Sequence, residues 1–239
     1  MIPLSAESDG VERRFPWMNF SLIVANFLVF FYELSLSDTG FNNFINAWSI
    51  VPCEYATHCA AYAGTPHPFF ITLFTSMFIH GSWEHILGNM LFLYVFGNQI
   101  DRSMGAWRYL VFYLLCGMGA NALEIATATT SSVPGLGASG AIAGVLAAYL
   151  VLYPNARIGT VLPISIVFIP ARMPAWVFIV GWFMIQLLSA VGAPADASGG
   201  GVAYFAHVGG FITGLLLVRL FVQEPRVRQL RNYHYSPFS

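Results

Sequence analysis

The chain has 239 residues, of which 57% are hydrophobic and only 9% carry a charge, and its formal net charge is -1. Average soluble domains carry roughly 25% charged residues, and a soluble fold this apolar would expose patches that promote aggregation. The composition therefore excludes an ordinary soluble protein and favours a chain whose solvent is the lipid bilayer. It also argues against a nucleic-acid partner, because phosphate binding needs an excess of basic residues.

Six stretches are apolar enough, or nearly so, to cross a bilayer as a helix of about 20 residues. In chain order they are 17–36, 84–100, 107–128, 139–153, 174–191 and 202–222. Trp and Tyr lie near several of their ends, as is typical of the membrane interface. The sequence therefore predicts an all-α, polytopic membrane bundle of six transmembrane helices. This membrane domain covers 17–222, between a short N-terminal segment, 1–16, and a C-terminal tail, 223–239.

The ten arginines, which are the only Lys or Arg residues in the chain, all fall on one side of this arrangement. Some precede the first span. Others lie between spans two and three or between spans four and five, and the rest lie at the end of the sixth span or after it. The loops on the other side, 37–83, 129–138 and 192–201, contain acidic residues but no Arg. The positive-inside rule then predicts that both termini are cytoplasmic.

The outer loop 37–83 is longer than ordinary loops. Its second half, 68–79, is apolar and aromatic, so we expect it to rest on the outer leaflet or to dip into it. Cys53 and Cys59 lie in this loop, outside the cytoplasm, where a disulfide can form. A zinc site that includes His58, or two free thiols, are alternatives that the sequence leaves open.

Four polar side chains are expected at a similar depth in the membrane. Since a helix rises 1.5 Å per residue, Ser139 on span four and His207 on span six lie roughly 22 Å and 21 Å above the inner ends of their helices. On span two, Asn89 lies about 18 Å and His85 about 24 Å above the inner end. The hydrocarbon core is about 30 Å thick, so this layer lies between the midplane and the outer surface. Polar side chains at such depth are costly and indicate a functional site.

Span four is also too short, because about 15 residues rise only ~22 Å. Irregular backbone, as expected for the preceding residues 133–137, is tolerated at membrane depth only where it lines a cavity or is buried in protein. We therefore predict a water-filled pocket that opens outward, with Ser139 at its floor and at a helix N-terminus, where free N–H groups can stabilise an anion. Gln186 on span five reaches the same layer and could hold water in the pocket. Glu124, at the outer end of span three, is expected to be solvated.

Small residues favour a close approach of spans four and six. Span four carries Gly140 and Gly144, and span six carries Gly210 in a similar small-residue pattern, which lets helix backbones come together. Close backbones would bring Ser139 within hydrogen-bonding reach of His207. A serine becomes a nucleophile when a base takes its proton, and histidine can do so near neutral pH. No Asp or Glu is evidently placed to orient the histidine, so we expect a dyad.

Hydrogen-bond donors for a developing oxyanion are also present. Asn89 and His85 share one face of a helix at i, i+4, and with the Ser139 backbone N–H they could serve one substrate oxygen. Taken singly, Ser139 is better explained as a small residue that eases helix packing, and the other three are explained equally well by interhelical hydrogen bonds. Their combination at one depth instead favours acyl transfer, most simply peptide-bond hydrolysis.

Three short segments, on spans two, four and six in that order, resemble the motifs of the rhomboid family of intramembrane serine proteases. They read HILGN at 85–89, GASG at 137–140 and AHVGG at 206–210. His80, five residues before His85, also fits the paired histidines of that family. The resemblance extends over about 68–222, which is essentially the whole predicted six-span core.

The resemblance implies that Ser139 is the nucleophile, that His207 is the general base, and that Asn89, His85 and the Ser139 amide form the oxyanion site. It implies a serine endopeptidase that cuts single-span membrane proteins near the outer face, with no metal or organic cofactor. Span five and the loop 192–201 would act as gate and cap. Since the simpler prokaryotic relatives have six spans and almost no extra domain, we expect a bacterial cytoplasmic (inner) membrane.

Two positions depart from the family pattern. Pro68-Phe69-Phe70 stands where many members have a Trp-Arg pair, and Ala143 stands where many have a Tyr that stacks on the histidine, so another group must hold the His207 ring. Two other functions stay open. A catalytically inactive relative that binds or escorts membrane proteins would usually lack the serine or the histidine, and this chain has both. A small-molecule transporter would often show an inverted repeat, and we find none.

Overall fold

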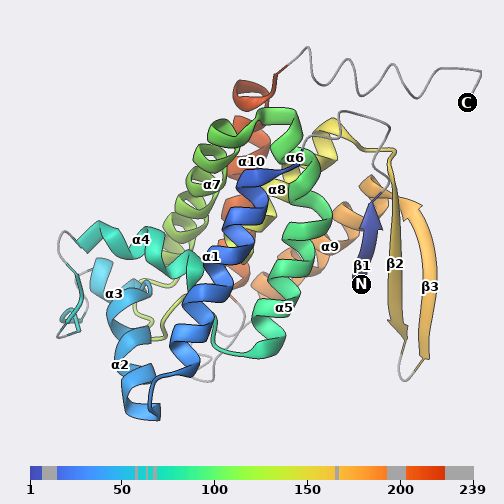
Figure 1. The fold of residues 1–239 in the computed structure, drawn as a ribbon. Helices are drawn as coiled ribbons and strands as arrows, with labels where there is room; N and C mark the ends of the chain where they lie inside the picture. The colour runs from blue at the N-terminus through green and yellow to red at the C-terminus, as the bar shows by residue number, and fades with distance from the viewer. Residues whose placement is uncertain are drawn as a thin grey trace, which may run out of the picture.

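The computed structural model describes residues 1–6, 15–56, 59–62, 64–66, 69–164, 167–192 and 203–223. The fold is a bundle of helices with a small sheet at one side (Figure 1). Among the described residues, three helices are long and apolar enough to cross a membrane, namely α1 (Trp17–Leu34), α7 (Ala106–Thr127) and α10 (Tyr204–Phe221). They match the first, third and sixth predicted spans.

The other predicted spans correspond to shorter helices. Span two is built from α5 (Trp83–Phe92), the π-helical turn η3 (Leu93–Gly97) and α6 (Asn98–Met104), which follow one another without a break. Spans four and five correspond to α8 (Ser139–Leu152) and α9 (Ala175–Gly192). The short fourth helix that begins at Ser139 is therefore confirmed, whereas the number of six membrane crossings stays a prediction.

The central helix of the bundle is α8, whose residues from Gly140 to Tyr149 are all buried. It packs against α7, α9 and α10. A Cβ atom added to Gly210 would overlap the carbonyl oxygen of Gly140, and one added to Gly214 would press on the carbonyl oxygen of Gly144. The small residues of the two helices therefore face each other, as predicted, and they allow α8 and α10 to lie backbone against backbone.

The outer loop 37–83 contains more regular structure than we expected. Ser37 caps the first of its helices, since its Oγ accepts a hydrogen bond from the Gly40 N–H. The helical elements of the loop are α2 (Asp38–Trp48), α3 (Pro52–Tyr55), η1 (Phe69–Ile71), α4 (Thr72–Thr75) and η2 (Ser76–Phe78). The apolar second half is thus a chain of short helical turns rather than an irregular loop.

Cys53 and Cys59 form a disulfide bond, which settles the three alternatives that the sequence left open. The pairing excludes two free thiols at these positions. His58 lies outside the described residues, and within the described part of the chain no three His, Cys, Asp or Glu side chains are grouped to hold a metal ion.

A three-stranded antiparallel sheet is the main difference from the all-α prediction. Its strands are β1 (Ile2–Ala6), β2 (Arg157–Ile164) and β3 (Val167–Pro174), in the order β1-β2-β3. The β2–β3 hairpin connects α8 to α9, a stretch to which the sequence analysis assigned no regular element. Its many β-branched residues favour strands, and the N-terminal segment completes the sheet by pairing with β2.

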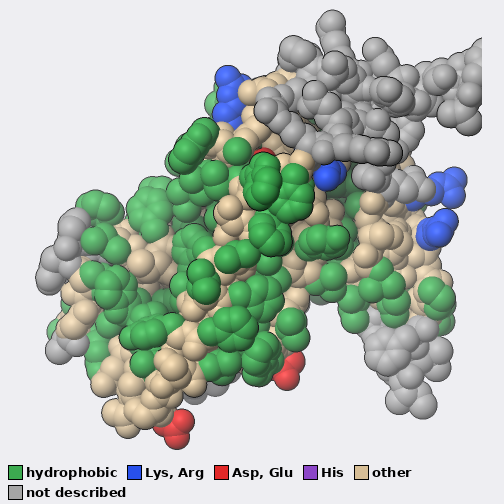
Figure 2. All heavy atoms as spheres, in the orientation of Figure 1, with side chains coloured by type: hydrophobic (Ala, Val, Ile, Leu, Met, Phe, Trp, Pro, Cys, Tyr) green, Lys and Arg blue, Asp and Glu red, His purple; other side chains and the backbone are tan. Residues whose placement is uncertain are grey.

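Hydrophobic side chains cover most of the face shown in Figure 2, over the helices of the bundle. Basic side chains gather toward one end of this face, and most of the acidic surface in this view lies at the opposite end. Among the most exposed residues are Trp17, Leu216 and Leu220, all on membrane-length helices. In water such a surface would aggregate, and in a bilayer it is the expected one.

Candidate active site

The four side chains singled out from the sequence line one cavity of about 890 Å³. Ser139 comes from the start of α8, His207 from α10, and His85 and Asn89 from α5. The side facing them is formed by α9 and by residues 133–136. Pockets that bind ligands are usually about 300–1,000 Å³, so this cavity has room for several side chains of a substrate.

The Ser139 Oγ lies 2.7 Å from the His207 Nε2. This distance is within the range in which a base can take the proton of a nucleophile. His207 is buried, with 6% of its surface exposed, so bulk water does not compete strongly for its ring nitrogen. The close packing of α8 on α10 is what brings the two side chains together, as we expected from the glycine pattern.

The turn that precedes Ser139 depends on a glycine. Gly137 has φ +117°, in the left-handed region where residues with a Cβ are strained. Its N–H donates to the Ser76 carbonyl oxygen at 2.8 Å, which anchors the turn to the outer loop. Helix α8 then begins at Ser139. The N–H groups of a first helical turn have no partner inside the helix, so they are available to an anion beside Ser139.

His85 and Asn89 both face this turn from one side of α5. A Cβ atom at Gly137 would lie 2.6 Å from the His85 Nε2 and 3.6 Å from the Asn89 Nδ2. The two side chains therefore lie close to the backbone that carries Ser139. This is the arrangement that an oxyanion site requires, with several donors directed to one place.

Asn89 is held by His80, a contact that the sequence did not define. The Asn89 Nδ2 lies 3.0 Å from the His80 Nε2, and the His80 Nδ1 lies 3.2 Å from the Phe78 carbonyl oxygen. A carbonyl only accepts, so the ring proton is on Nδ1 and Nε2 accepts from the Asn89 amide. The His80 backbone N–H in turn donates to the buried carboxylate of Glu33 on α1. These contacts hold the Asn89 amide of α5 against His80, and they hold His80 in turn against Glu33 of α1.

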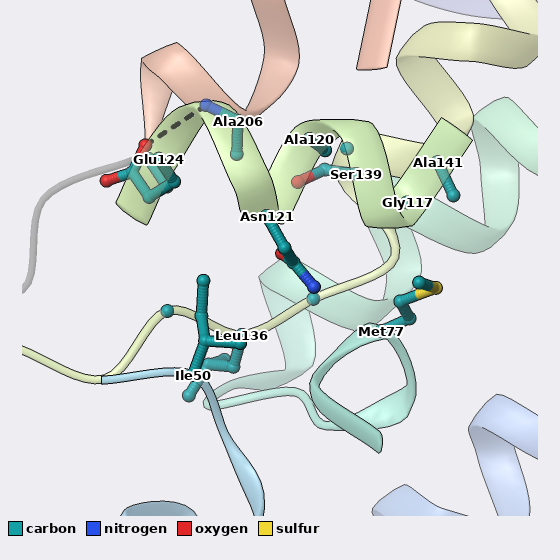
Figure 3. A pocket seen from close by; sticks show the side chains of 14 residues that line it. Ile50, Met77, Gly117, Ala120, Asn121, Glu124, Leu136, Ser139, Ala141 and Ala206 are labelled. Atoms are coloured by element: carbon teal, nitrogen blue, oxygen red, sulfur yellow. Dashed lines mark hydrogen bonds between the residues drawn. The ribbon is translucent and has the colours of Figure 1, made fainter. Parts of the chain in front are cut away.

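Glu124, which we expected to be solvated, is half-buried and therefore only partly exposed to solvent. Its carboxylate accepts a hydrogen bond of 3.0 Å from the Ala206 N–H, at the start of α10 and next to His207 in sequence (Figure 3). The first N–H groups of α10 have no partner inside the helix, so a carboxylate from α7 can satisfy one of them. Glu124 also borders a second, much smaller cavity behind Ser139, which Figure 3 shows together with Asn121.

The support of His207 comes from α9. The Gln186 Oε1 lies 2.7 Å from the His207 Nδ1. The Trp182 ring, one turn earlier on α9, lies 5.7 Å from the His207 ring at an angle of 41°. From the sequence we expected Gln186 only to hold water in the pocket. The signal that could have found this contact is the i, i+4 spacing of Trp182 and Gln186, which places both on one face of α9.

Two features named in the sequence analysis lie wholly or partly outside the described residues. The proposed cap is the loop 192–201, and residues 193–202 lie outside the described part of the chain. The Trp-Arg position of the family falls on Pro68-Phe69-Phe70, of which Pro68 is outside the described residues. Ala143, which stands where many family members have a Tyr that stacks on the histidine, is buried inside α8.

Together, the fold and the cavity define a membrane-embedded helical protein with a serine–histidine pair in its core. A family model described as the Rhomboid domain matches residues 68–224. The chain therefore belongs to the rhomboid family, as its motifs indicated.

Three relatives illustrate the range of the family. The chain is 29% identical over 167 residues to Rhomboid-like protein 11, chloroplastic, of Arabidopsis thaliana, covering 66% of this chain and 55% of that protein. It is 29% identical over 168 residues to Rhomboid protein 1, mitochondrial, of Saccharomyces cerevisiae, covering 67% and 45%. It is 29% identical over 171 residues to Rhomboid protease AarA of Providencia stuartii, covering 66% and 58%. The chain thus spans about half the length of these relatives.

Proposed function

We propose that this protein is an intramembrane serine endopeptidase. The observation that carries the proposal is the 2.7 Å contact between the Ser139 Oγ and the His207 Nε2, inside a cavity surrounded by helices. The relative from Providencia stuartii is named as a protease, which supports the same chemistry here. The alternative of a catalytically inactive binding or escort protein is disfavoured by the intact, directly contacting pair.

In the proposed reaction, the Ser139 Oγ attacks the carbonyl carbon of the scissile peptide bond as the His207 Nε2 takes its proton. The negative charge that develops on the carbonyl oxygen is stabilised by the Ser139 N–H and by the side chains of Asn89 and His85. His207 then gives its proton to the departing amine, which leaves an acyl group on Ser139. A water molecule, deprotonated by His207, hydrolyses this ester and restores the serine.

The proposed substrates are single-span membrane proteins that reach the cavity from the bilayer. We propose six membrane crossings, with both termini on the arginine-rich, cytoplasmic side and the cavity toward the outer face. Span five, which is α9, and the loop after it would form the gate and the cap of the cavity. The bacterial cytoplasmic membrane stays a prediction, because the relatives include chloroplastic and mitochondrial proteins as well as a bacterial one.

The test is cleavage of a single-span reporter protein by the purified full chain in liposomes. We expect the wild type to cut the reporter near its outer interface and Ser139→Ala to leave it intact. Equal cleavage by both forms would assign the activity to a contaminant and refute the proposal. Stable capture of the reporter without cleavage, by wild type and Ser139→Ala alike, would instead support the escort function.

A further inference from the structure

The side chain of Gln186 makes a specific polar contact with the proposed base. Its Oε1 lies 2.7 Å from the His207 Nδ1, on the side of the ring opposite to the nitrogen that contacts Ser139. Gln186 is half-buried, and it lines the same cavity as Ser139 and His207. One imidazole ring is therefore held at both nitrogens, by residues from α8 and α9.

This contact selects the state of the ring that catalysis needs. A neutral imidazole carries one proton, on either Nδ1 or Nε2. An amide oxygen only accepts hydrogen bonds, so Gln186 favours the tautomer in which Nδ1 carries the proton. The Nε2 lone pair then faces the Ser139 hydroxyl. In the opposite tautomer, Nε2 would carry a proton and could not take one from Ser139.

The contact also restricts the orientation of the ring. Ala143 on α8 has no ring to stack on His207, and its side chain is buried inside the bundle. The aromatic neighbours of His207 among the described residues are Trp182 and Tyr204, with ring centroids 5.7 Å and 6.5 Å away. These contacts limit the tilt of the imidazole but do not distinguish its two nitrogens. Gln186 provides the directional contact.

We propose that Gln186 is a positioning residue that holds His207 in the tautomer and orientation required to deprotonate Ser139. The inference rests on the proposed protease function, and it adds a third side chain to the dyad. Because Gln186 belongs to α9, the competence of the base depends on the position of α9 beside α10. A displacement of α9 would release the His207 Nδ1 and leave the ring free to turn.

The first experiment compares two substitutions of Gln186 with a control on the same helix. Gln186→Leu keeps a similar volume but removes the acceptor, and Gln186→Glu keeps an acceptor oxygen. Met184→Leu, at an exposed site of α9 outside the cavity lining, controls for general disturbance of the helix. Cleavage of the single-span reporter in liposomes gives kcat and KM for each form.

We expect Gln186→Leu to lower kcat by about 10- to 100-fold with KM little changed, since one hydrogen bond that orients the base is lost. Gln186→Glu should keep kcat within roughly a few-fold of wild type, because its carboxylate can accept from Nδ1–H. Met184→Leu should behave as wild type. Wild-type kcat in Gln186→Leu, or equal losses in the Leu and Glu variants, would overturn the inference.

A second measurement does not depend on proteolysis. Nitrogen-15 NMR of the histidine-labelled full chain in detergent reports which ring nitrogen of His207 carries the proton, with a His207→Ala sample for assignment. We expect the Nδ1–H form in wild type and a mixture of tautomers in Gln186→Leu. A wild-type ring protonated on Nε2 alone would overturn the inference. Failure of the wild type to cleave any reporter would count against the proposed protease function instead.

Discussion

Replacing Gly210 by alanine should separate the two members of the proposed dyad. A Cβ atom at this position overlaps the carbonyl oxygen of Gly140, which is backbone and cannot rotate away. The helices α8 and α10 must therefore move apart, by about 1 Å, and overpacking of this kind typically costs about 1–3 kcal/mol. Ser139 directly precedes Gly140 on α8, and His207 lies three residues before Gly210 on α10.

The separation acts directly on the reacting atoms. The distance from Ser139 Oγ to His207 Nε2 would grow from 2.7 Å to about 3.7 Å, beyond the range of a useful hydrogen bond. A misplacement of about 1 Å in catalytic groups can lower the rate by about 10²-fold. We therefore expect Gly210→Ala to remain membrane-inserted but to lose about 100-fold in kcat.

The assay is cleavage of the single-span reporter in liposomes, with helix content followed by circular dichroism. Gly181→Ala on α9 is the matched control, because its new Cβ would meet only the flexible end of Met1, at 3.3 Å. We expect this control to cleave at the wild-type rate. Full activity in Gly210→Ala would show that the α8–α10 contact does not set the Ser139–His207 geometry, and the reasoning would be refuted.

Three further changes give distinct outcomes. Asn89→Ala should lower kcat by about 10²–10³-fold with little change in KM, as expected for a lost oxyanion donor, and an unchanged kcat would remove Asn89 from that role. Glu124→Ala should destabilise the start of α10 at Ala206 by roughly 0.5–2 kcal/mol, seen as a lower midpoint of thermal unfolding, whereas Glu124→Gln keeps an acceptor and should lose less. Replacing Cys53 and Cys59 together by serine should cost no more than about 2–3 kcal/mol of stability, because the bridge closes a short loop with a sequence separation of 6. We expect this double variant to keep cleaving the reporter. Loss of cleavage would show that the outer loop shapes the cavity.

The centre of the fold could be predicted from the sequence because its constraints are local. Helix rise places Ser139 and His207 at similar heights, and the irregular stretch before Ser139 restricts where α8 can begin. The facing glycines of α8 and α10 follow from a spacing that is visible in the chain. These features require no knowledge of which rotamers the side chains adopt.

The remaining contacts depend on tertiary structure. The Gln186 and Glu124 side chains act across helix boundaries, on His207 and on the Ala206 N–H respectively. Helix periodicity gives their height and face but not their partner. The β1–β2–β3 sheet was missed for a related reason, since β1 pairs with a strand more than 150 residues away in sequence, and short strands carry little periodic signal.

Covalent labelling of Ser139 tests the central claim, that His207 makes this serine a nucleophile inside the membrane. The full chain in liposomes is treated with a serine-directed fluorophosphonate, and the modified residue is located by mass spectrometry. The structure predicts labelling at Ser139 in wild type and none there in His207→Ala. Equal labelling of Ser139 in both forms, or labelling of wild type only at other residues, would contradict the account.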